Sequence, residues 1–354
     1  MKGRQILIEP LPGGGDATAL LVDGQLHDLL IDPPAGSAPQ PEAIFRAVAS
    51  RPMKGLGGAM VDLGAGHSGF LRNRRLPPPG RPVLVQVGGW AEPGKAPPVG
   101  ERIRLKGRFA ILTPGAPGRN IARSIRAPDL RQSLEALADS AMEGAPDDLG
   151  LILRSAAATA PAPAIAREIE ALRAEWQPIA AAAADAAPAC LRPAPGAAET
   201  ARRDWWTPDA ALREAATALA DAGIWEAVAA MADARIPAGD GHFTIEATRA
   251  LVAVDVNTGA DTSPAAALKA NLAAIRDLPR QLRLRGLGGQ IVLDLAPLPK
   301  GERRRIEAAL TAALRNEDID TTIVGWTPLG HLELLRKRAR RPLVGPEALP
   351  LRGG

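Results

Sequence analysis

Two apolar segments in the C-terminal part of the chain each carry an aspartate near their end. Residues 250–259 contain Asp255 and, two positions later, Asn257, while residues 289–295 contain Asp294. Short apolar runs of this kind are typical of buried strands. An ionised carboxylate in apolar surroundings is costly unless it has a partner or a metal. We therefore expect both aspartates at neighbouring strand ends, where they and the asparagine offer the oxygen ligands that suit Mg²⁺.

A basic helix is predicted between these two strands, over residues 263–285. Ser263 is a typical capping residue, Pro264 suits the first helical position, and apolar residues then recur at helical spacing. Gly286 marks the end of the helix, and we expect Pro279 to kink the helix or end it early. Arginines crowd its last part, where they complement the helix dipole: Arg276, Arg280, Arg283 and Arg285. The alternative to metal binding is that the two aspartates cap strand ends or pair with these arginines.

The region from Gly241 onward alternates strands and helices. This order predicts an α/β domain. In such sheets ligands bind beyond the carboxyl ends of the strands, which is where the two aspartates and the asparagine fall. The predicted strands are 243–256, 290–295 and 320–325, and the predicted helices are 263–285 and 300–316.

The N-terminal region reads as short strands separated by turns. Residues 4–9 and 18–32 are predicted strands with a turn at residues 13–15 between them, and a Pro/Ala/Gly/Ser-rich stretch at 33–42 is typical of a linker. Residues 43–107 contain several short apolar runs between glycines and prolines. This predicts a small β-barrel, of which the oligonucleotide-binding barrel is one form. Two aromatic residues in it suit either the core or stacking against nucleobases: Phe70 and Trp90.

The middle of the chain mixes strands with alanine-rich helices. Residues 64–69 spell G-x-G-x-x-G, but no amphipathic helix follows, so we do not expect dinucleotide binding. No internal repeat is evident. We predict strands at 108–112 and 149–155, helices at 130–142 and 165–188, and one or two helices within 208–231.

Charge is distributed unevenly along the 354 residues, although the net charge is only +4. Lys and Arg outnumber Asp and Glu in residues 101–131 and 280–341. Two basic regions around an acidic pair suit a polyanion that must also meet a metal, and a solvated charged surface is the alternative. The basic run at 336–341 is open to the same two interpretations, RNA-backbone contact or a solvated tail.

Several classes of protein are excluded by residue usage. Cys190 is the only cysteine, which rules out an internal disulfide framework and a cysteine-based zinc cluster within one chain. No apolar run reaches the ~20 residues that span a bilayer. The N-terminus reads as the start of a strand and not as a signal peptide, so we expect a cytoplasmic protein.

The segment 250–259, followed by 280–289 and 291–295, resembles the ribonuclease E/G family. Weaker similarity extends along the chain in the family's order, at 61–71 and 149–156 among other places. The resemblance implies an α/β, multidomain fold. It comprises an S1-like (OB-type) β-barrel inserted near the N-terminus, an RNase H-like/5′-sensor region and a C-terminal DNase I-like α/β catalytic domain.

Domain boundaries follow from the same resemblance. The expected parts are the N-terminal strands of an RNase H-like subdomain at 1–38, the S1-like RNA-binding barrel at 39–107, a 5′-sensor-like region at 108–192, the helical remainder of the RNase H-like subdomain at 193–235, the DNase I-like catalytic domain at 236–345 and a tail at 346–354.

The family implies Mg²⁺-dependent endonucleolytic cleavage of single-stranded, AU-rich RNA in RNA processing and decay, leaving a 5′ phosphate and a 3′ hydroxyl. By match, Asp255 and Asp294 would hold Mg²⁺, with Mn²⁺ as an alternative ion, and Asn257 would orient the scissile phosphate or an aspartate. A second interpretation is a non-catalytic RNA-binding or regulatory protein on the same scaffold. A third, a phosphoesterase for small substrates, is disfavoured by the barrel and the basic regions.

RNA contacts are also implied by the resemblance. Phe70 matches a base-stacking aromatic of the barrel, a second family aromatic falls on Met60, and Lys95 takes the place of a family lysine. Arg154 and Ser155 match the pair that holds a 5′ monophosphate. Basic residues expected to contact RNA are Arg280, Arg283, Arg285, Arg336, Lys337 and Arg338.

The sequence departs from the family where a Cys-Pro-x-Cys zinc link and a small dimerisation domain usually follow. The chain stops at Gly354 without either feature. We therefore expect no zinc and no zinc-linked tetramer, and the sequence leaves the oligomeric state open.

Overall fold

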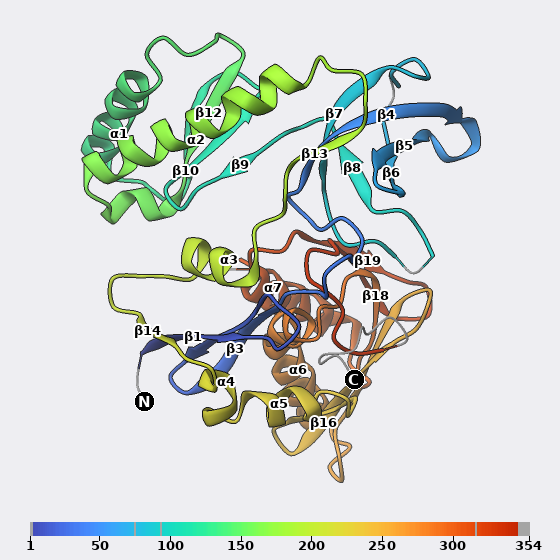
Figure 1. Ribbon diagram of the computed structural model, residues 1–354. Helices are drawn as coiled ribbons and strands as arrows, with labels where there is room; N and C mark the ends of the chain where they lie inside the picture. The colour runs from blue at the N-terminus through green and yellow to red at the C-terminus, as the bar shows by residue number, and fades with distance from the viewer. Residues whose placement is uncertain (1–2, 74–75, 93, 316, 346–354) are drawn as a thin grey trace. The chain divides into compact units, whose positions relative to one another are not determined.

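The computed structural model describes residues 3–73, 76–92, 94–315 and 317–345. The fold is mixed α/β and multidomain, and the chain divides into two compact units (Figure 1). Unit 1 joins Met1–Ser37 to Gly196–Gly354, and unit 2 is Ala38–Pro195, inserted between them. No helix of the described residues is long and apolar enough to cross a membrane.

Unit 2 begins with a closed barrel of five strands, drawn in blue to cyan in Figure 1. The strand order is β4-β5-β6-β8-β7, and pairing of β4 with β7 closes the ring around a mostly aliphatic core. The prediction of a small β-barrel is thus confirmed. A sixth strand, β13 (Ala189–Arg192), pairs with the first part of β4. The barrel strands are β4 (Ile44–Met53), β5 (Gly58–Gly64), β6 (His67–Leu71), β7 (Pro82–Val87) and β8 (Pro98–Gly100), with the short 3-10 helix η1 (Lys54–Leu56) after β4.

The remainder of unit 2 is a four-stranded sheet in the order β11-β12-β10-β9, covered by two helices. Its core joins the strands to the apolar side of α1 and α2. The Glu168 carboxylate, on α2, accepts hydrogen bonds from three consecutive backbone N–H groups of residues 108–110, which fixes the turn between β9 and β10. The elements are β9 (Leu105–Lys106), β10 (Ala110–Pro114), β11 (Arg119–Ile121), α1 (Pro128–Ala141), β12 (Leu149–Leu153), the 3-10 helix η2 (Ser155–Thr159) and α2 (Ala162–Ala182).

Unit 1 contains a small N-terminal sheet in the order β14-β1-β2-β3. The predicted strand 18–32 is in fact two strands, because Asp23 and Gly24 both have positive φ (51° and 79°) and turn the chain back on itself. The prediction of one or two helices within residues 208–231 is confirmed, because two helices lie there. The first part of this segment also holds a strand, not predicted, that pairs in parallel with β1. The elements are β1 (Arg4–Pro10), β2 (Asp16–Val22), β3 (Gln25–Ile31), α3 (Ala197–Asp204), β14 (Ala211–Glu214), α4 (Ala218–Asp221) and α5 (Ile224–Ala230).

The larger sheet of unit 1 has the order β15-β16-β17-β18-β20-β19. Strands β17 and β18 run parallel and are joined by α6, while the other neighbouring strands pair antiparallel. Apolar residues of α6 and α7 share one core with the sheet, which confirms the predicted α/β pattern. The elements are β15 (Arg235–Ala238), β16 (Gly241–Ala247), β17 (Val252–Asn257), α6 (Pro264–Leu284), β18 (Gly289–Asp294), the 3-10 helix η3 (Lys300–Glu302), α7 (Arg303–Leu314), β19 (Thr321–Trp326) and β20 (Leu332–Arg336).

Two details of this sheet and its helix differ from the sequence-based expectation, and a third agrees with it. The predicted strand 243–256 is a hairpin, with a turn held by hydrogen bonds between Thr248 and Leu251. Helix α6 continues through Pro279 to Leu284, so the expectation that it might end early is wrong. It stops where predicted, because Gly286 has φ of 67° and a Cβ there would lie 1.8 Å from the Arg341 carbonyl oxygen.

Candidate active site

Strand alternation places both predicted metal-binding aspartates on one side of the larger sheet. In β17 and β18 the residues that pack beneath the helices are apolar and buried, whereas Asp255 and Asp294 point the other way and are exposed. We call this helix-free side the carboxylate face. Because successive residues of a strand point to opposite faces, an aspartate can follow an apolar run without entering the core.

The parallel register brings the two carboxylates together. Asp255 of β17 pairs directly with Asp294 of β18, and neighbouring strands lie about 4.8 Å apart. Like charges in directly opposed positions of a sheet repel one another. A cation between them would offset that repulsion.

Each carboxylate has a polar neighbour on the same face. Asn257 Nδ2 donates a hydrogen bond to Asp255 Oδ2 at 2.8 Å, one of the two contacts predicted for this amide. His331 Nδ1 lies 3.3 Å from Asp294 Oδ1. His331 was missed from the sequence, because strand β20, which places it, was not predicted. Among the residues that the structure describes, no group of three or more His, Cys, Asp or Glu side chains is arranged to hold a metal.

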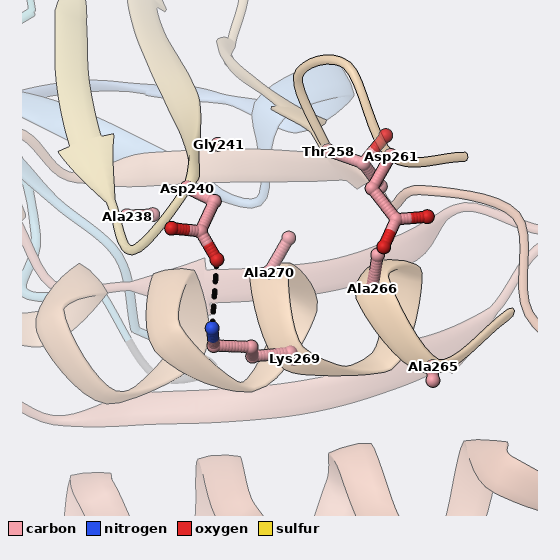
Figure 2. A pocket seen from close by; sticks show the side chains of 9 residues that line it. All are labelled: Ala238, Asp240, Gly241, Thr258, Asp261, Ala265, Ala266, Lys269 and Ala270. Carbon is pink, nitrogen blue, oxygen red and sulfur yellow. Dashed lines mark hydrogen bonds and ion pairs between the residues drawn. The ribbon is translucent and has the colours of Figure 1, made fainter. Parts of the chain in front are cut away.

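A pocket of about 220 Å³ opens beside the end of β17, between the turn before β16 and the first turns of α6 (Figure 2). Across it Lys269 Nζ pairs with Asp240 Oδ2 at 2.8 Å, and this contact raises the pKa of the lysine. The pKa of Asp261 is lowered by hydrogen bonds from Ser263. A Cβ at Gly241 would lie 2.1 Å from the Asn257 carbonyl oxygen, so the close packing of these backbones requires glycine.

Three of the arginines predicted to contact RNA are buried. Arg283, Arg285 and Arg336 are 8%, 3% and 2% exposed, and burial lowers the pKa of Arg285 and Arg336. The expectation of RNA contact does not fit these side chains, because they leave almost no surface for a ligand. Their spacing on α6 and β20 indicated a basic surface, whereas the fold turns them inward.

Two of the three buried arginines, Arg283 and Arg336, lie beside acidic residues of unit 1. Arg283 pairs with Glu317 at 2.5 Å and with Asp28 at 3.4 Å, and Arg336 lies 3.5 Å from Glu317. Arg340 joins the same cluster through Asp28 at 2.8 Å. The cluster thereby links β3 of the small sheet to α6 and β20 of the larger one.

The remaining basic residues of the RNA-contact prediction in unit 1 differ in exposure. Arg280 is partly buried, pairs with Asp277 at 2.7 Å and donates to the Leu26 carbonyl at 2.9 Å. Arg285 hydrogen-bonds Gln281. Among the described residues, no ion pair joins an arginine of α6 to Asp255 or Asp294. Lys337 is exposed and Arg338 is half-buried.

On the barrel of unit 2, Phe70 is half-buried and pairs across the strands with Met60. Both side chains point away from the buried residues that alternate with them on β5 and β6. Trp90 is also half-buried. Lys95 is exposed and pairs with Glu92 at 2.6 Å. Phe70 and Lys95 are therefore placed where a ligand can reach them.

The predicted 5′-phosphate pair lies at the end of β12. Arg154 is half-buried, and its Nη1 donates to the Gly107 carbonyl at 2.6 Å, so the arginine also has a structural contact. Ser155 begins η2 and is exposed. Of these two side chains, only that of Ser155 is classed as exposed.

Comparison with known proteins agrees with this architecture. A family model described as the ribonuclease E/G family matches residues 104–212 and 211–339. Ribonuclease E of Nostoc sp. is 28% identical over 377 residues, which cover 90% of this chain and 54% of that protein. Ribonuclease E of Escherichia coli is 28% identical over 379 residues, covering 90% of this chain and 35% of that protein. Ribonuclease G of Salmonella typhimurium is 38% identical over 109 residues, 28% of this chain and 22% of that protein.

This chain therefore spans about half, or less, of the length of these curated relatives. The family model nevertheless covers most of the chain, including both strands of the carboxylate face. The chain belongs to the ribonuclease E/G family.

Proposed function

We propose that this protein is an endoribonuclease that cuts single-stranded RNA at the Asp255–Asp294 pair. The observation that carries the proposal is the parallel register of β17 and β18, which sets the two carboxylates side by side on an exposed face. Relatives named ribonuclease E and ribonuclease G support the reaction class. The closed barrel of unit 2 then takes the S1-like RNA-binding role, and the larger sheet of unit 1 the DNase I-like catalytic role.

The donor set at the carboxylate face fits Mg²⁺, and Mn²⁺ as a substitute. Mg²⁺ keeps several waters and is commonly held by one or two carboxylates together with substrate phosphates, so a two-carboxylate site suits it and a closed all-protein cage is not needed. Asp255 and Asp294 would hold the ion, and Asn257 keeps the Asp255 carboxylate oriented through the 2.8 Å hydrogen bond. When bound, the ion would activate water for attack and offset charge on the phosphate in the transition state.

The substrate we propose is single-stranded, AU-rich RNA. Phe70 offers a face for base stacking, while exposed cations such as Lys95 and Lys337 can contact phosphates. Arg154 and Ser155 are proposed to recognise a 5′ monophosphate. Because Arg154 also anchors Gly107, Ser155→Ala is the cleaner test: it should reduce the preference for 5′-monophosphorylated over 5′-hydroxyl RNA, and an unchanged preference would remove Ser155 from the sensor.

The central experiment compares cleavage of a labelled single-stranded RNA in Mg²⁺ and in EDTA. The wild type should cut only with metal, and Asp294→Asn should lose cleavage while RNA affinity is kept or raised, because a repulsive charge is removed. Glu246→Gln is the matched control, since it removes an exposed carboxylate from β16 of the same sheet without touching the pair.

Three outcomes are informative. Cleavage by Asp294→Asn at the wild-type rate would remove this residue from the mechanism. Tight binding without cutting by every variant, the wild type included, would favour a non-catalytic RNA-binding protein. Equal loss of activity in Glu246→Gln would show that the effect comes from the general charge of the sheet and not from the aspartate pair.

A further inference from the structure

His331 lies opposite Asp294 because of the register between β18 and β20. Leu293 pairs with Leu332, and both side chains are buried beneath the helices. The next residues along, Asp294 and His331, therefore point to the carboxylate face. This register brings His331 Nδ1 to 3.3 Å from Asp294 Oδ1.

The ring nitrogen of His331 that faces Asp294 makes no hydrogen bond to another described residue. Nδ1 of His331 is buried and lacks a hydrogen-bond partner of good geometry, although the side chain as a whole is 32% exposed. A buried polar atom without a partner is costly. The Asp294 carboxylate is the acceptor nearest to this ring nitrogen among the contacts described, at 3.3 Å, and its side chain is 65% exposed.

A tight turn holds the His331 backbone in place. Thr327 N donates to the His331 carbonyl at 2.8 Å, and His331 N donates to Thr327 Oγ1 at 3.1 Å. The Arg303 guanidinium stacks on the ring of Trp326, the last residue of β19, at 4.6 Å from the ring centre. Leu332, which is fully buried, fixes the chain on the other side. The backbone that carries the imidazole is therefore held in place by the hydrogen bonds of the β19–β20 turn and by the buried Leu332.

We propose that His331 is a positioning residue for Asp294, an inference that rests on the proposed function. Nδ1–H of the imidazole donates to Asp294 Oδ1 and leaves Oδ2 for the metal. Asn257 has the same relation to Asp255, so each carboxylate would have its own donor on the same face. Direct ligation by the imidazole is not favoured, because the described residues contain no three-member His, Cys, Asp or Glu group arranged for a metal.

The experiment uses three substitutions of His331 that differ in where they place a donor. The amide of His331→Asn reaches the position of Nδ1, the amide of His331→Gln reaches that of Nε2, and His331→Leu has no donor. Mn²⁺ affinity is measured by electron paramagnetic resonance without RNA, beside cleavage in Mg²⁺ and RNA binding in EDTA. We expect the Leu and Gln variants to lose about 10–100-fold in Mn²⁺ affinity and in cleavage, and the Asn variant to restore most of both.

RNA binding in EDTA should not change in any of the three variants. His67→Leu, a histidine substitution on the barrel, is the matched control and should retain wild-type Mn²⁺ affinity. Wild-type Mn²⁺ affinity and cleavage in His331→Leu would overturn the positioning role while the proposed function stands. Rescue by Gln and not by Asn would also overturn it, because contact would then be made through Nε2. The proposed function itself would be overturned by two results together: the wild type binds Mn²⁺ no more tightly than Asp294→Asn does, and it does not cleave RNA.

Discussion

Asn257 and Asp255 are two residues apart on β17, so their side chains leave the strand on the same face. The hydrogen bond from the amide to Oδ2 limits rotation of an otherwise exposed carboxylate. Groups that orient metal ligands commonly influence metal affinity or activity by 10–100-fold. At the residue scale, the site therefore depends on neighbours of the aspartates as well as on the aspartates.

Asn257→Ala should lower the cleavage rate by about 10–100-fold, because Asp255 loses the donor that orients it. RNA affinity and the unfolding midpoint should stay at wild-type values, since the amide is on the surface. Single-turnover cleavage with a parallel binding titration measures the two effects separately. A full rate in Asn257→Ala would show that the hydrogen bond has no part in the mechanism.

His27 belongs to the buried charge cluster, where its Nδ1 lies 3.2 Å from Arg283 Nη2. Burial, and then the charge of Arg283, lower the pKa of His27 below its ordinary value. The folded state thus keeps this ring neutral at pH values where the unfolded chain protonates it. The stability that depends on the neutral ring is present above about pH 6.5 and is lost as the pH falls towards the lowered pKa.

Between pH 8 and pH 5.5, the urea midpoint of unit 1 should consequently fall further in the wild type than in His27→Gln, which cannot titrate. Fluorescence of the tryptophans in unit 1 reports the transition. Parallel pH profiles for the two proteins would mean that His27 is not linked to folding.

At the scale of elements, one side chain of α2 binds the backbone of the β9–β10 turn through three hydrogen bonds. Glu168 accepts from the N–H groups of Arg108, Phe109 and Ala110 at 2.9, 2.7 and 2.9 Å. Hydrogen bonds to a charged acceptor are stronger than neutral ones. This turn also carries Gly107, to which Arg154 is anchored, so the contact supports the proposed 5′-phosphate sensor.

Glu168→Ala should free three backbone donors and speed amide hydrogen exchange in residues 107–112, through a local loss of about 2 kcal/mol. Glu170→Ala is the matched control, because Glu170 is exposed two positions further along the same helix. Mass spectrometry of exchanged peptides resolves the segment. Equal protection in the two variants would contradict the bracing role.

Elements with a strong apolar period could be predicted from the sequence, and those without one could not. Strands β17 and β18 bury one regular side, and apolar residues recur at helical spacing along α6, so their patterns are clear. Strand β14 is exposed at all four residues and carries no such pattern. Strand β20 includes Arg336, a buried cation whose partner Glu317 is distant in sequence. From the sequence alone its basic end therefore fits RNA contact or a solvated tail, and not a buried strand.

The candidate site could be predicted in part for the same reason. Asp255 and Asp294 follow apolar runs, so their position at strand ends is visible in the sequence. The role of His331 depends on the register of β20 against β18, which only the folded sheet defines. The buried arginines were misassigned because charge alone does not say which side of an element faces the core.

At the scale of the molecule, unit 2 is an insertion within unit 1. The chain leaves unit 1 at Ser37 and returns at Gly196. Asp32 lies close to this junction: it accepts from Asp16 N at 2.9 Å and from Ala197 N at 2.8 Å. Because Asp32, in the segment that leads out of unit 1, binds the backbone of the returning segment at Ala197, the two ends can be joined by a short linker.

Unit 1 with residues 38–195 replaced by a Gly/Ser linker should fold and bind Mn²⁺ through the carboxylate face. Isolated unit 2 should bind single-stranded RNA with an affinity that falls as salt rises, since its contacts are mainly with phosphates and bases. Calorimetry measures Mn²⁺ binding to unit 1, and fluorescence titration measures RNA binding to unit 2. Failure of folded, isolated unit 2 to bind RNA would contradict the division of roles.

The most direct measurement is single-turnover cleavage of a labelled 5′-monophosphorylated, AU-rich single-stranded RNA in Mg²⁺ by the wild type and Asp255→Asn, with the RNA affinity of both measured in EDTA. We predict that the wild type cuts and leaves a 5′ phosphate and a 3′ hydroxyl, and that Asp255→Asn binds as tightly without cutting. Cleavage by Asp255→Asn at the wild-type rate would contradict the claim that the aspartate pair on β17 and β18 is the catalytic site.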